Sequence, residues 1–453
     1  MLYYSYYSKN KMRSVRKIAC RTEENTMNIA LLNDSFPPLI DGVANTVVNY
    51  ARYLNSGADR ALVVTPEYPQ ADDSAFPYPV LRYPGLDARK LTGYIAGYPF
   101  SPRVERELAA QPVELLHSHC PISSTLLARG LQTKLDVPLV MTYHTKFDID
   151  IANIISSRLL QDAAVTALVD NITACDEVWV VSRGAGENLR SLGYEGEYVV
   201  MENGVDMPRG RLPEAETAAL TAEAGLPAGV PVYLFVGRLM WYKGLRLILD
   251  ALAALRSQRM DFRMVFVGGG ADEREIRAYA AERGLGDRVI FTGPIHDRKK
   301  LSAWYCRADL FLFPSTFDTN GLVVHEAAAC FLPAVLVQDS CAAEPVTDGH
   351  NGFLIEENAA SLAVCLTRLY EHPERVREVG AMAGAELYLS WEEAVRRARE
   401  RYAVVIDNYR SGKYPPHRRV QDEFFRMQGD LMELVARADD WRSEWKRRMD
   451  RYL

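Results

Sequence analysis

The sequence contains no long hydrophobic run: no segment approaches the about eighteen consecutive apolar residues that a membrane-spanning helix needs. Cysteine is scarce, with seven thiols scattered at positions 20, 120, 175, 306, 330, 341 and 365 and no Cys-x-x-Cys pair. This odd, dispersed set indicates reduced thiols in a cytosolic protein rather than a disulfide framework or a zinc site. Positive charge is not in excess either. The net charge is -6, so the composition favours no nucleic-acid partner.

The first 26 residues also lack a continuous apolar segment, although they carry six Lys and Arg residues. An ordinary signal peptide has such a segment, so we interpret 1–26 as a disordered basic leader without a structural role. At the other end, interleaved charges and aromatics predict a helical tail that is solvated, packed on itself, or laid on a membrane surface. We expect a cytoplasmic protein, with peripheral contact at the inner face of the membrane as an open alternative.

From Met27 onward, short apolar strands alternate with helical segments in two successive sets. This alternation predicts an α/β protein with parallel sheets wrapped by helices, and 453 residues allow two or three domains. Ligands of such doubly wound sheets bind at the carboxyl ends of the strands. The predicted organisation is the leader at 1–26, a Rossmann-like half at 27–207, a linker at 208–230, a second such half at 231–390, an amphipathic helix at 391–409 and the tail at 410–453.

The segment Pro314–Val335 contains a predicted strand end, a tight loop and a helix. Turn and cap formers at 315–320 lead to Gly321, where the backbone can approach a ligand closely. Helical apolar spacing then begins at Leu322. The free amides at the start of such a helix form a ready anion site.

Two acids flank this helix start, Asp318 in the loop and Glu326 in the helix. They would lie about 12 Å apart if the stretch were helical throughout, which matches a sugar diphosphate joined to a ribose. The alternative is a buried strand and helix with Asp318 as a solvated cap.

A second loop carries two cations. The predicted strand Val232–Val236 delivers Arg238 and Lys243 to the carboxyl edge of the second sheet, and Gly237 and Gly244 allow the loop between them to bend. Two cations at a strand end suit a pyrophosphate, which Arg binds as a planar fork and Lys as a point charge. The alternative is a pair of solvated basic residues.

Two glycine positions are weaker candidates for close approach of the backbone to a ligand. Gly268 begins a Gly-Gly-Gly turn after a predicted strand, which either permits close approach to a ligand or is a plain turn. Gly42 follows Asp41 between the first strand and a helix, without the G-x-G-x-x-G fingerprint of dinucleotide sites. An amide at Gly42 can still reach a phosphate.

Histidines end two neighbouring strands of the first set, at His119 and His144. Their equivalent positions favour a functional site for at least His144, whereas we interpret His117 as structural. The D-x-D tripeptide at 148–150 is the one pattern that suggests a metal. Such tripeptides are common by chance, so we expect neither a metal nor another cofactor.

Together these residues resemble a retaining glycosyltransferase of family 4, which has the GT-B architecture of two Rossmann-like domains facing a cleft. The resemblance covers the chain from Met27 to about Tyr409. Its marks are Gly237-Arg238 with Lys243, the Asn-Gly-Val-Asp run at 203–206, and the two acids eight positions apart. The run His-Thr-Lys-Phe-Asp at 144–148 and the Asn-Gly-Leu at 320–322 resemble the bacterial branch that contains diacylglycerol glucosyltransferases.

The resemblance implies roles for individual residues. Arg238 and Lys243 would hold the donor diphosphate, Glu326 the nucleotide ribose, and Asp318 the donor sugar. His144 would lie near the transferred sugar. The backbone at Gly42, Gly268, Asn320, Gly321 and Leu322 would complete the donor site.

Two departures from the family pattern concern the sugar. Asp318 replaces the usual glutamate, and Asn320 stands where phenylalanine is common.

Retention by double displacement would need a carboxylate nucleophile about 5–5.5 Å from its partner, and no residue stands out as one. The resemblance therefore implies front-face attack, with His144, Asp318, Arg238 and Lys243 as the catalytic set.

The sequence thus predicts a hexosyltransferase that uses a nucleotide diphosphate sugar, with UDP-hexose as the expected donor and a glycolipid or cell-envelope saccharide as acceptor. Three alternatives remain: a small soluble acceptor, a nucleotide-sugar epimerase of the same fold, and a non-catalytic sugar-nucleotide binding module.

Overall fold

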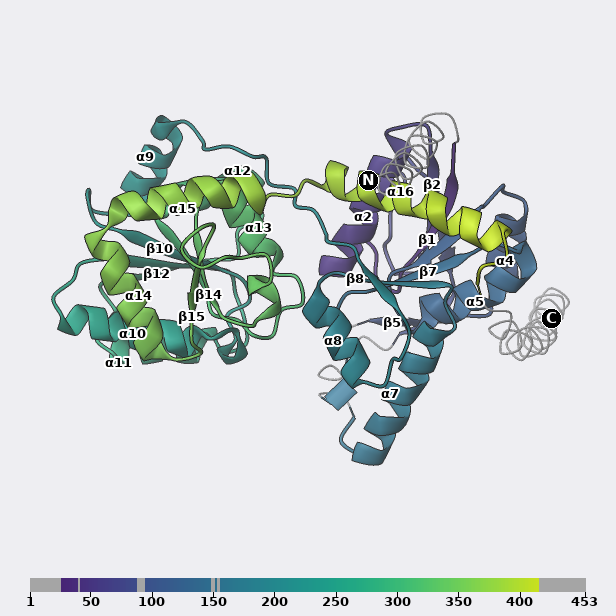
Figure 1. The fold of residues 1–453 in the computed structure, drawn as a ribbon, viewed down its shortest axis with the longest axis horizontal. Helices are drawn as coiled ribbons and strands as arrows, with labels where there is room; N and C mark the ends of the chain where they lie inside the picture. The colour runs from purple at the N-terminus through teal and green to yellow at the C-terminus, as the bar shows by residue number, and fades with distance from the viewer. Residues whose placement is uncertain (1–25, 40, 88–93, 148–150, 153–154, 415–453) are drawn as a thin grey trace, which may run out of the picture. The chain divides into compact units, whose positions relative to one another are not determined.

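The computed structural model describes residues 26–39, 41–87, 94–147, 151–152 and 155–414. These residues divide into two compact units, each with its own parallel sheet (Figure 1). Unit 1 contains the described residues up to Val181, Gly186–Met201, and those from Val395 onward. Unit 2 contains Ser182–Ala185 and Glu202–Ala394. The predicted fold class, two doubly wound Rossmann-like halves, is confirmed.

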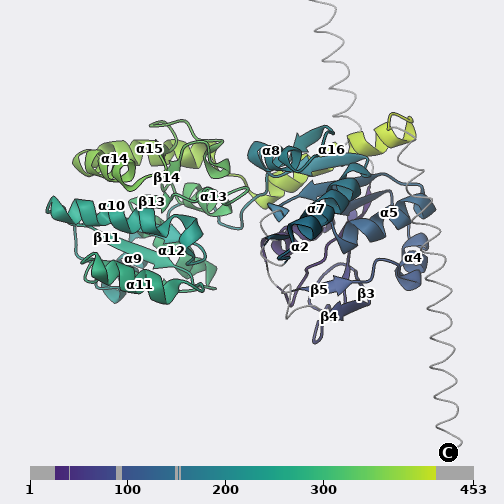
Figure 2. The same cartoon turned by 90° about the horizontal axis from the view of Figure 1, so that it is seen from below.

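The sheet of unit 1 has seven parallel strands in the order β3-β2-β1-β6-β7-β8-β9. Its central strands are buried along almost their whole length because helices cover both faces, as expected for a parallel sheet (Figure 2). The strands are β1 (Asn28–Leu32), β2 (Arg60–Pro66), β3 (Val80–Tyr83), β6 (Leu115–Ser118), β7 (Leu139–Tyr143), β8 (Glu177–Val180) and β9 (Tyr198–Val200). The helices are α2 (Gly42–Asn55), α4 (Pro102–Ala109), α5 (Ser123–Leu135), α7 (Arg158–Thr173) and α8 (Arg183–Ser191).

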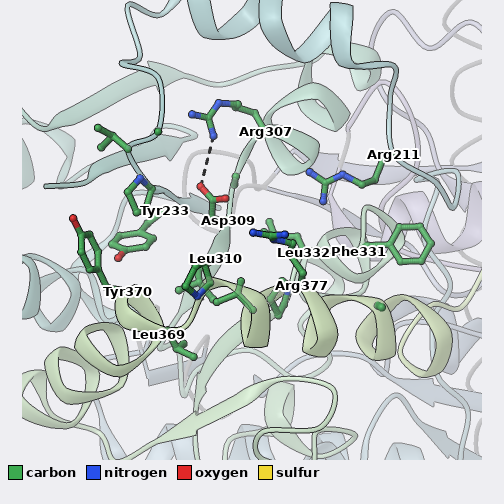
Figure 3. A pocket seen from close by; sticks show the side chains of 18 residues that line it. Arg211, Tyr233, Arg307, Asp309, Leu310, Phe331, Leu332, Leu369, Tyr370 and Arg377 are labelled. Atoms are coloured by element: carbon green, nitrogen blue, oxygen red, sulfur yellow. Dashed lines mark ion pairs between the residues drawn. The ribbon is translucent and has the colours of Figure 1, made fainter.

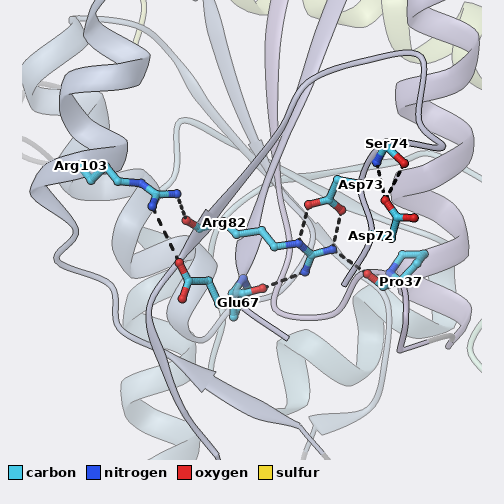
Figure 4. Close-up of polar contacts among 8 residues, drawn as sticks. Pro37, Glu67, Asp72, Asp73, Ser74, Arg82 and Arg103 are labelled. Carbon is cyan, nitrogen blue, oxygen red and sulfur yellow. Dashed lines mark hydrogen bonds and ion pairs between the residues drawn. The ribbon is translucent and has the colours of Figure 1, made fainter. Parts of the chain in front are cut away.

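A two-stranded antiparallel ribbon, β4 (Gly85–Asp87) with β5 (Ile95–Gly97), follows β3. Beside it, the guanidinium of Arg82 on β3 organises the loops at this edge (Figure 4). Arg82 binds both carboxylate oxygens of Asp73 at 2.8 Å and donates to the carbonyls of Pro37 and Pro66 at 2.7 and 3.0 Å. The bond to Pro37 anchors the loop that leads from β1 to α2.

Helix α16 (Trp391–Arg410) begins in unit 2 and belongs to unit 1 from Val395 onward. Arg401 donates hydrogen bonds of 2.8 and 2.6 Å to the two carboxylate oxygens of Glu177. The buried Tyr402 hydroxyl lies 2.5 Å from Nδ1 of His117. These contacts tie the second half of the helix to the core of unit 1.

The sheet of unit 2 has six parallel strands in the order β12-β11-β10-β13-β14-β15. The strands are β10 (Val232–Val236), β11 (Arg263–Val267), β12 (Val289–Gly293), β13 (Leu310–Phe313), β14 (Ala334–Val337) and β15 (Phe353–Ile355). The helices are α9 (Glu214–Glu223), α10 (Leu245–Ser257), α11 (Glu273–Glu282), α12 (Arg298–Arg307), α13 (Leu322–Ala329), α14 (Ala359–Glu371) and α15 (Pro373–Glu386), with short 3₁₀ turns η1 (Trp241–Lys243) and η2 (Cys341–Ala343).

The strand order of unit 2 reverses at β10, which has β11 on one side and β13 on the other. Loops at such a switch point lie next to each other at the carboxyl edge of the sheet, where ligands of this fold class bind. The two loops here are those after β10 and after β13, which carry the predicted cations and the predicted acid loop.

Two sequence expectations can be compared with the structure at this level. The six cysteines among the described residues form no disulfide with one another. Within the part of the chain that the structure describes, no helix combines the length and the apolar character needed to cross a membrane.

Candidate functional site

The loops after β10 and β13 meet through an ion pair. Lys243, at the end of η1, places its ammonium nitrogen 2.6 Å from Oδ1 of Asp318. Gly244 makes this approach possible, because its φ is +76° and a Cβ there would lie 2.5 Å from the carbonyl oxygen of Pro314. Only glycine lets the two backbones come this close.

Lys243 is almost fully buried, with a side-chain exposure of 8%. Its ammonium lies 5.6 and 5.3 Å from the centres of the neighbouring Tyr242 and Phe317 rings, within cation–π range of both. Burial lowers the pKa of Lys243 below its ordinary 10.5, the Asp318 carboxylate opposes this shift, and Arg238 adds to it. Lys243 is therefore a fixed, poorly hydrated cation next to the exposed guanidinium of Arg238.

The loop after β13 contains buried polar atoms without partners. Ser315 Oγ, Asp318 Oδ2 and Asn320 Nδ2 make no hydrogen bond to any described residue. Orphaned buried polar atoms are costly and uncommon, so three within six positions indicate a surface shaped for a polar ligand. Helix α13 starts directly afterwards from Gly321 at φ +63°, and no side chain caps its first amides. Those amides stay available to an anion.

Glu326, on α13, is buried and both of its oxygens are bound by side chains from α12. Arg298 donates to Oε1 and the hydroxyl of Tyr305 donates to Oε2, each at 2.9 Å. Burial raises the pKa of Glu326, and the Arg298 charge acts in the opposite direction. A ribose hydroxyl would have to share these oxygens with Arg298 and Tyr305. Neither residue was identified from the sequence, because nothing in the pattern of α12 places it against α13.

Packing against protein explains Gly268 and Gly204. A Cβ at Gly268, where φ is +136°, would lie 2.0 Å from the carbonyl oxygen of Gly237. Gly268 thus allows the loop after β11 to support the loop that carries Arg238. A Cβ at Gly204, in the Asn-Gly-Val-Asp run, would lie 2.4 Å from the backbone nitrogen of Trp391. In both cases the close neighbour is backbone of the same unit.

The predicted residues of unit 1 lie at the carboxyl edge of its sheet. Nε2 of His144 lies 3.0 Å from Nδ1 of the buried His119, so one of the two imidazoles donates to the other. Burial lowers the pKa of His144 to about 3 and that of His119 well below its ordinary value. Both rings are therefore neutral near neutral pH. His117 bonds to Tyr402 and Thr142 through its two ring nitrogens, which agrees with a structural role.

Gly42 is the first residue of α2, whose start is capped by the Asp41 carboxylate at 2.7 Å from the Ala44 amide. A Cβ at Gly42 would meet no atom within 4 Å, so packing does not demand glycine there. Gly42 and His144 belong to unit 1, whereas the remaining predicted residues belong to unit 2. The D-x-D at 148–150 lies outside the described residues, and within them no group of three or more His, Cys, Asp or Glu could hold a metal ion.

Two family descriptions match consecutive parts of the chain. Residues 40–209 match Glycosyltransferase Family 4 and residues 217–384 match Glycosyl transferases group 1. Among curated relatives, a D-inositol 3-phosphate glycosyltransferase of Xylanimonas cellulosilytica is 28% identical over 335 residues, which are 71% of this chain and 79% of the relative. The alpha-monoglucosyldiacylglycerol synthase of Acholeplasma laidlawii is 24% identical over 360 residues, 77% of this chain and 89% of the relative.

Solved structures share the fold at lower identity. HepE of Anabaena in complex with UDP has a TM-score of 0.68 and 21% identity, over 83% of this chain and all of that one. Sucrose-phosphate synthase of Thermosynechococcus elongatus also has a TM-score of 0.68, with 22% identity, over 84% and 99% of the two chains.

Proposed function

Because this chain is a glycosyltransferase of the family 4 and group 1 type that acts on nucleotide sugars, we propose that it transfers a hexose from UDP-hexose to a glycolipid or cell-envelope saccharide with retention of anomeric configuration. The observation that carries the proposal is the loop after β13. There Asp318 pairs with Lys243 on one side, while its second oxygen and two neighbouring side chains are buried without partners.

In this proposal the donor lies along the carboxyl edge of unit 2. Arg238 and Lys243 bind the diphosphate, and the uncapped amides at the start of α13 complete its charge neutralisation. The orphaned oxygen of Asp318 accepts a hydroxyl of the sugar. Glu326, held by Arg298 and Tyr305, accepts from the ribose. The roles that the resemblance implies for Gly42 and His144, which belong to unit 1, stay predictions.

The proposed reaction is a front-face displacement. The bond between the anomeric carbon and the diphosphate oxygen breaks, and the acceptor hydroxyl bonds to the same face of that carbon. The leaving diphosphate oxygen takes the acceptor proton. Asp318 supports this route, because a carboxylate paired with a buried ammonium is a poor nucleophile for the double displacement used by retaining hydrolases. Catalysis then rests on position and on fixed positive charge.

We further propose that the reaction needs no divalent metal, because two cations and a helix start already face the diphosphate. Turnover should survive excess EDTA. The Lys243→Ala variant should have no turnover, with or without added Mg²⁺. Activity that is abolished by EDTA and restored by Mn²⁺, with Lys243→Ala silent, would place the diphosphate elsewhere.

The acceptor is the finer part of the proposal. The Acholeplasma relative is named for a glucosyldiacylglycerol product, and the run at 144–148 resembles that branch. The inositol-phosphate relative favours a second candidate, a small phosphorylated polyol. Purified enzyme incubated with UDP-hexoses and either lipid extract or soluble polyol phosphates separates the two.

Product analysis by NMR of the anomeric proton tests retention, and incubation without acceptor tests the epimerase alternative. An inverted product would overturn the mechanism, and an epimerised UDP-hexose would overturn transfer. If the acceptor is a membrane lipid, the protein should co-sediment with anionic liposomes less well as salt rises. Equal recovery in the supernatant with and without liposomes would contradict the lipid acceptor.

A further inference from the structure

Unit 2 contains a cavity at the edge of its sheet opposite the loops that follow β10 and β13. This cavity of about 730 Å³ is lined by residues that precede or open three neighbouring strands: Pro231 before β10, Asp309 before β13 and Pro333 before β14 (Figure 3). The ends of α12 and α14, the segment that follows α13 and the start of α15 close it. None of the predicted donor residues lines this cavity.

Positive charge dominates its walls. The charged lining residues are Arg211, Arg307, Arg377 and Asp309, three cations against one carboxylate. Figure 3 shows the three arginines reaching the cavity from different elements. Arg307 is partly neutralised, because its Nη1 lies 3.6 Å from Asp309 and its Nε donates to Thr221 at 2.9 Å.

The other two arginines, Arg211 and Arg377, have N–H donors that are not used by the described residues. Arg211 is exposed and its recorded partner is the carbonyl of Cys306, which carries no net charge. Arg377 is exposed on α15, where its charge acts on the Glu374 carboxylate, but no hydrogen bond or ion pair joins its side chain to the described residues. Converging guanidinium groups without carboxylate partners are suited to phosphate, which they bind through paired N–H donors.

The other lining residues are mostly apolar, and two aromatic side chains lie at opposite ends of the cavity (Figure 3). Tyr370, at the end of α14, is 38% exposed, and Phe331 is half-buried directly after α13. Phe331 adopts φ +58°, a left-handed conformation that is rare for a bulky residue. Gly380 and Gly384 leave room for this conformation, since a Cβ at either would clash with the Phe331 backbone or ring. The guanidinium carbon of Arg209 lies 5.8 Å from the centre of the Phe331 ring, so Tyr370 is the aromatic side chain of this cavity that is left for a ligand.

We propose that this cavity binds a small phosphate monoester that carries a ring, with the phosphate on Arg211 and Arg377 and the ring against Tyr370 (Figure 3). The site is separate from the donor loops, because it lies at the amino ends of β10 and β13 whereas Lys243 and Asp318 follow their carboxyl ends. Its occupancy does not depend on the proposed reaction.

Phenyl phosphate is the simplest probe, with phenol and inorganic phosphate as its two halves. Calorimetric titration is done with the full-length protein in saturating UDP, so that the donor site cannot account for the heat. Phenyl phosphate should bind at least about tenfold more tightly than either half, a difference that corresponds to about 1.4 kcal/mol. Equal affinity for phenyl phosphate and either half, or displacement by UDP, would overturn the proposal.

Variants of the cavity residues test which side chains contact phenyl phosphate. Arg377→Ala and Arg211→Ala should each weaken phenyl phosphate about tenfold or more, whereas Tyr370→Ala should weaken phenyl phosphate but not inorganic phosphate. Arg375→Ala is the matched control, because Arg375 lies on the same helix but pairs with Glu378 and the Gly349 carbonyl. All four changed side chains are exposed, so thermal unfolding should stay near that of the unchanged protein. Wild-type affinity in Arg377→Ala would contradict the assignment.

Discussion

The ammonium group of Lys243 lies 2.6 Å from Oδ1 of Asp318, a residue 75 positions further along the chain. The two were predicted to contact different parts of a donor, Lys243 the diphosphate and Asp318 the sugar. Their pairing means that a diphosphate must share or replace the carboxylate as the partner of the lysine. The pair is thus neutral by itself at the proposed donor site, which leaves Arg238 as a further cation beside it.

Donor binding should make Lys243 take up a proton at alkaline pH. Burial holds the pKa of Lys243 below 10.5 in this state, and two further negative charges beside the ammonium would raise it. At a pH between the pKa of Lys243 without UDP and its higher pKa with UDP bound, binding therefore adds a proton to the lysine. At neutral pH the lysine is already charged, so no proton is taken up. Calorimetry in buffers of different ionisation enthalpy measures this uptake.

Lys243→Arg is the control, because its guanidinium remains charged across the whole range. It should bind UDP without proton uptake. Buffer-independent heats at alkaline pH in the unchanged protein would contradict the proposed contact between Lys243 and the diphosphate.

Glu326→Ala should reduce both stability and turnover. The change removes a buried carboxylate and leaves the Tyr305 hydroxyl without its acceptor, which costs roughly 1–3 kcal/mol in the free energy of unfolding. Glu326→Gln keeps an acceptor for Tyr305 and should recover part of that stability, but it loses the charge and should remain weakly active. Urea unfolding and steady-state kinetics measure the two effects. A stable Glu326→Gln variant with wild-type KM for the donor would refute the ribose assignment.

His144 should remain neutral throughout the working range. Because burial lowers its pKa to about 3, the ring does not titrate between about pH 5 and 8, and NMR of the ring nitrogens should show no change there. A neutral ring acts by hydrogen bonding, so His144→Gln should retain more activity than His144→Ala. Equal loss in both variants, with an NMR titration near pH 6.5, would indicate a charged or proton-transferring histidine.

Gly268→Ala should disturb the donor loop, whereas Gly269→Ala should not. A methyl group at 268 would lie 2.0 Å from the Gly237 carbonyl and would require a strained φ of +136°. The nearest atom to a methyl at 269 is 3.7 Å away. We expect a lower midpoint of thermal unfolding and weaker UDP binding for Gly268→Ala alone. Similar behaviour of the two variants would show that the loop after β11 gives no support to Arg238.

The amino-acid sequence by itself determined the two doubly wound halves and the edges of their strands. Strands such as β10 and β13 are continuous apolar runs because both faces of a parallel sheet are buried, and such runs are visible without a structure. The same local reasoning placed Arg238, Lys243, Asp318 and Glu326 in loops or helix starts after strands. It did not find the ribbon β4–β5, whose three-residue strands are too short for a periodic pattern.

Only the tertiary structure decided which side chains meet. Lys243 and Asp318 pair because β10 and β13 are neighbours in the sheet, although β11, β12 and α12 lie between them in the sequence. Tertiary packing likewise brings Arg298 and Tyr305 to Glu326, although these residues are distant in the sequence. It also brings three arginines from separate segments to the wall of one cavity. Periodicity reports the burial of each element, but strand order and helix packing arise from the chain as a whole, and they set the contacts on which charge and hydrogen bonding depend.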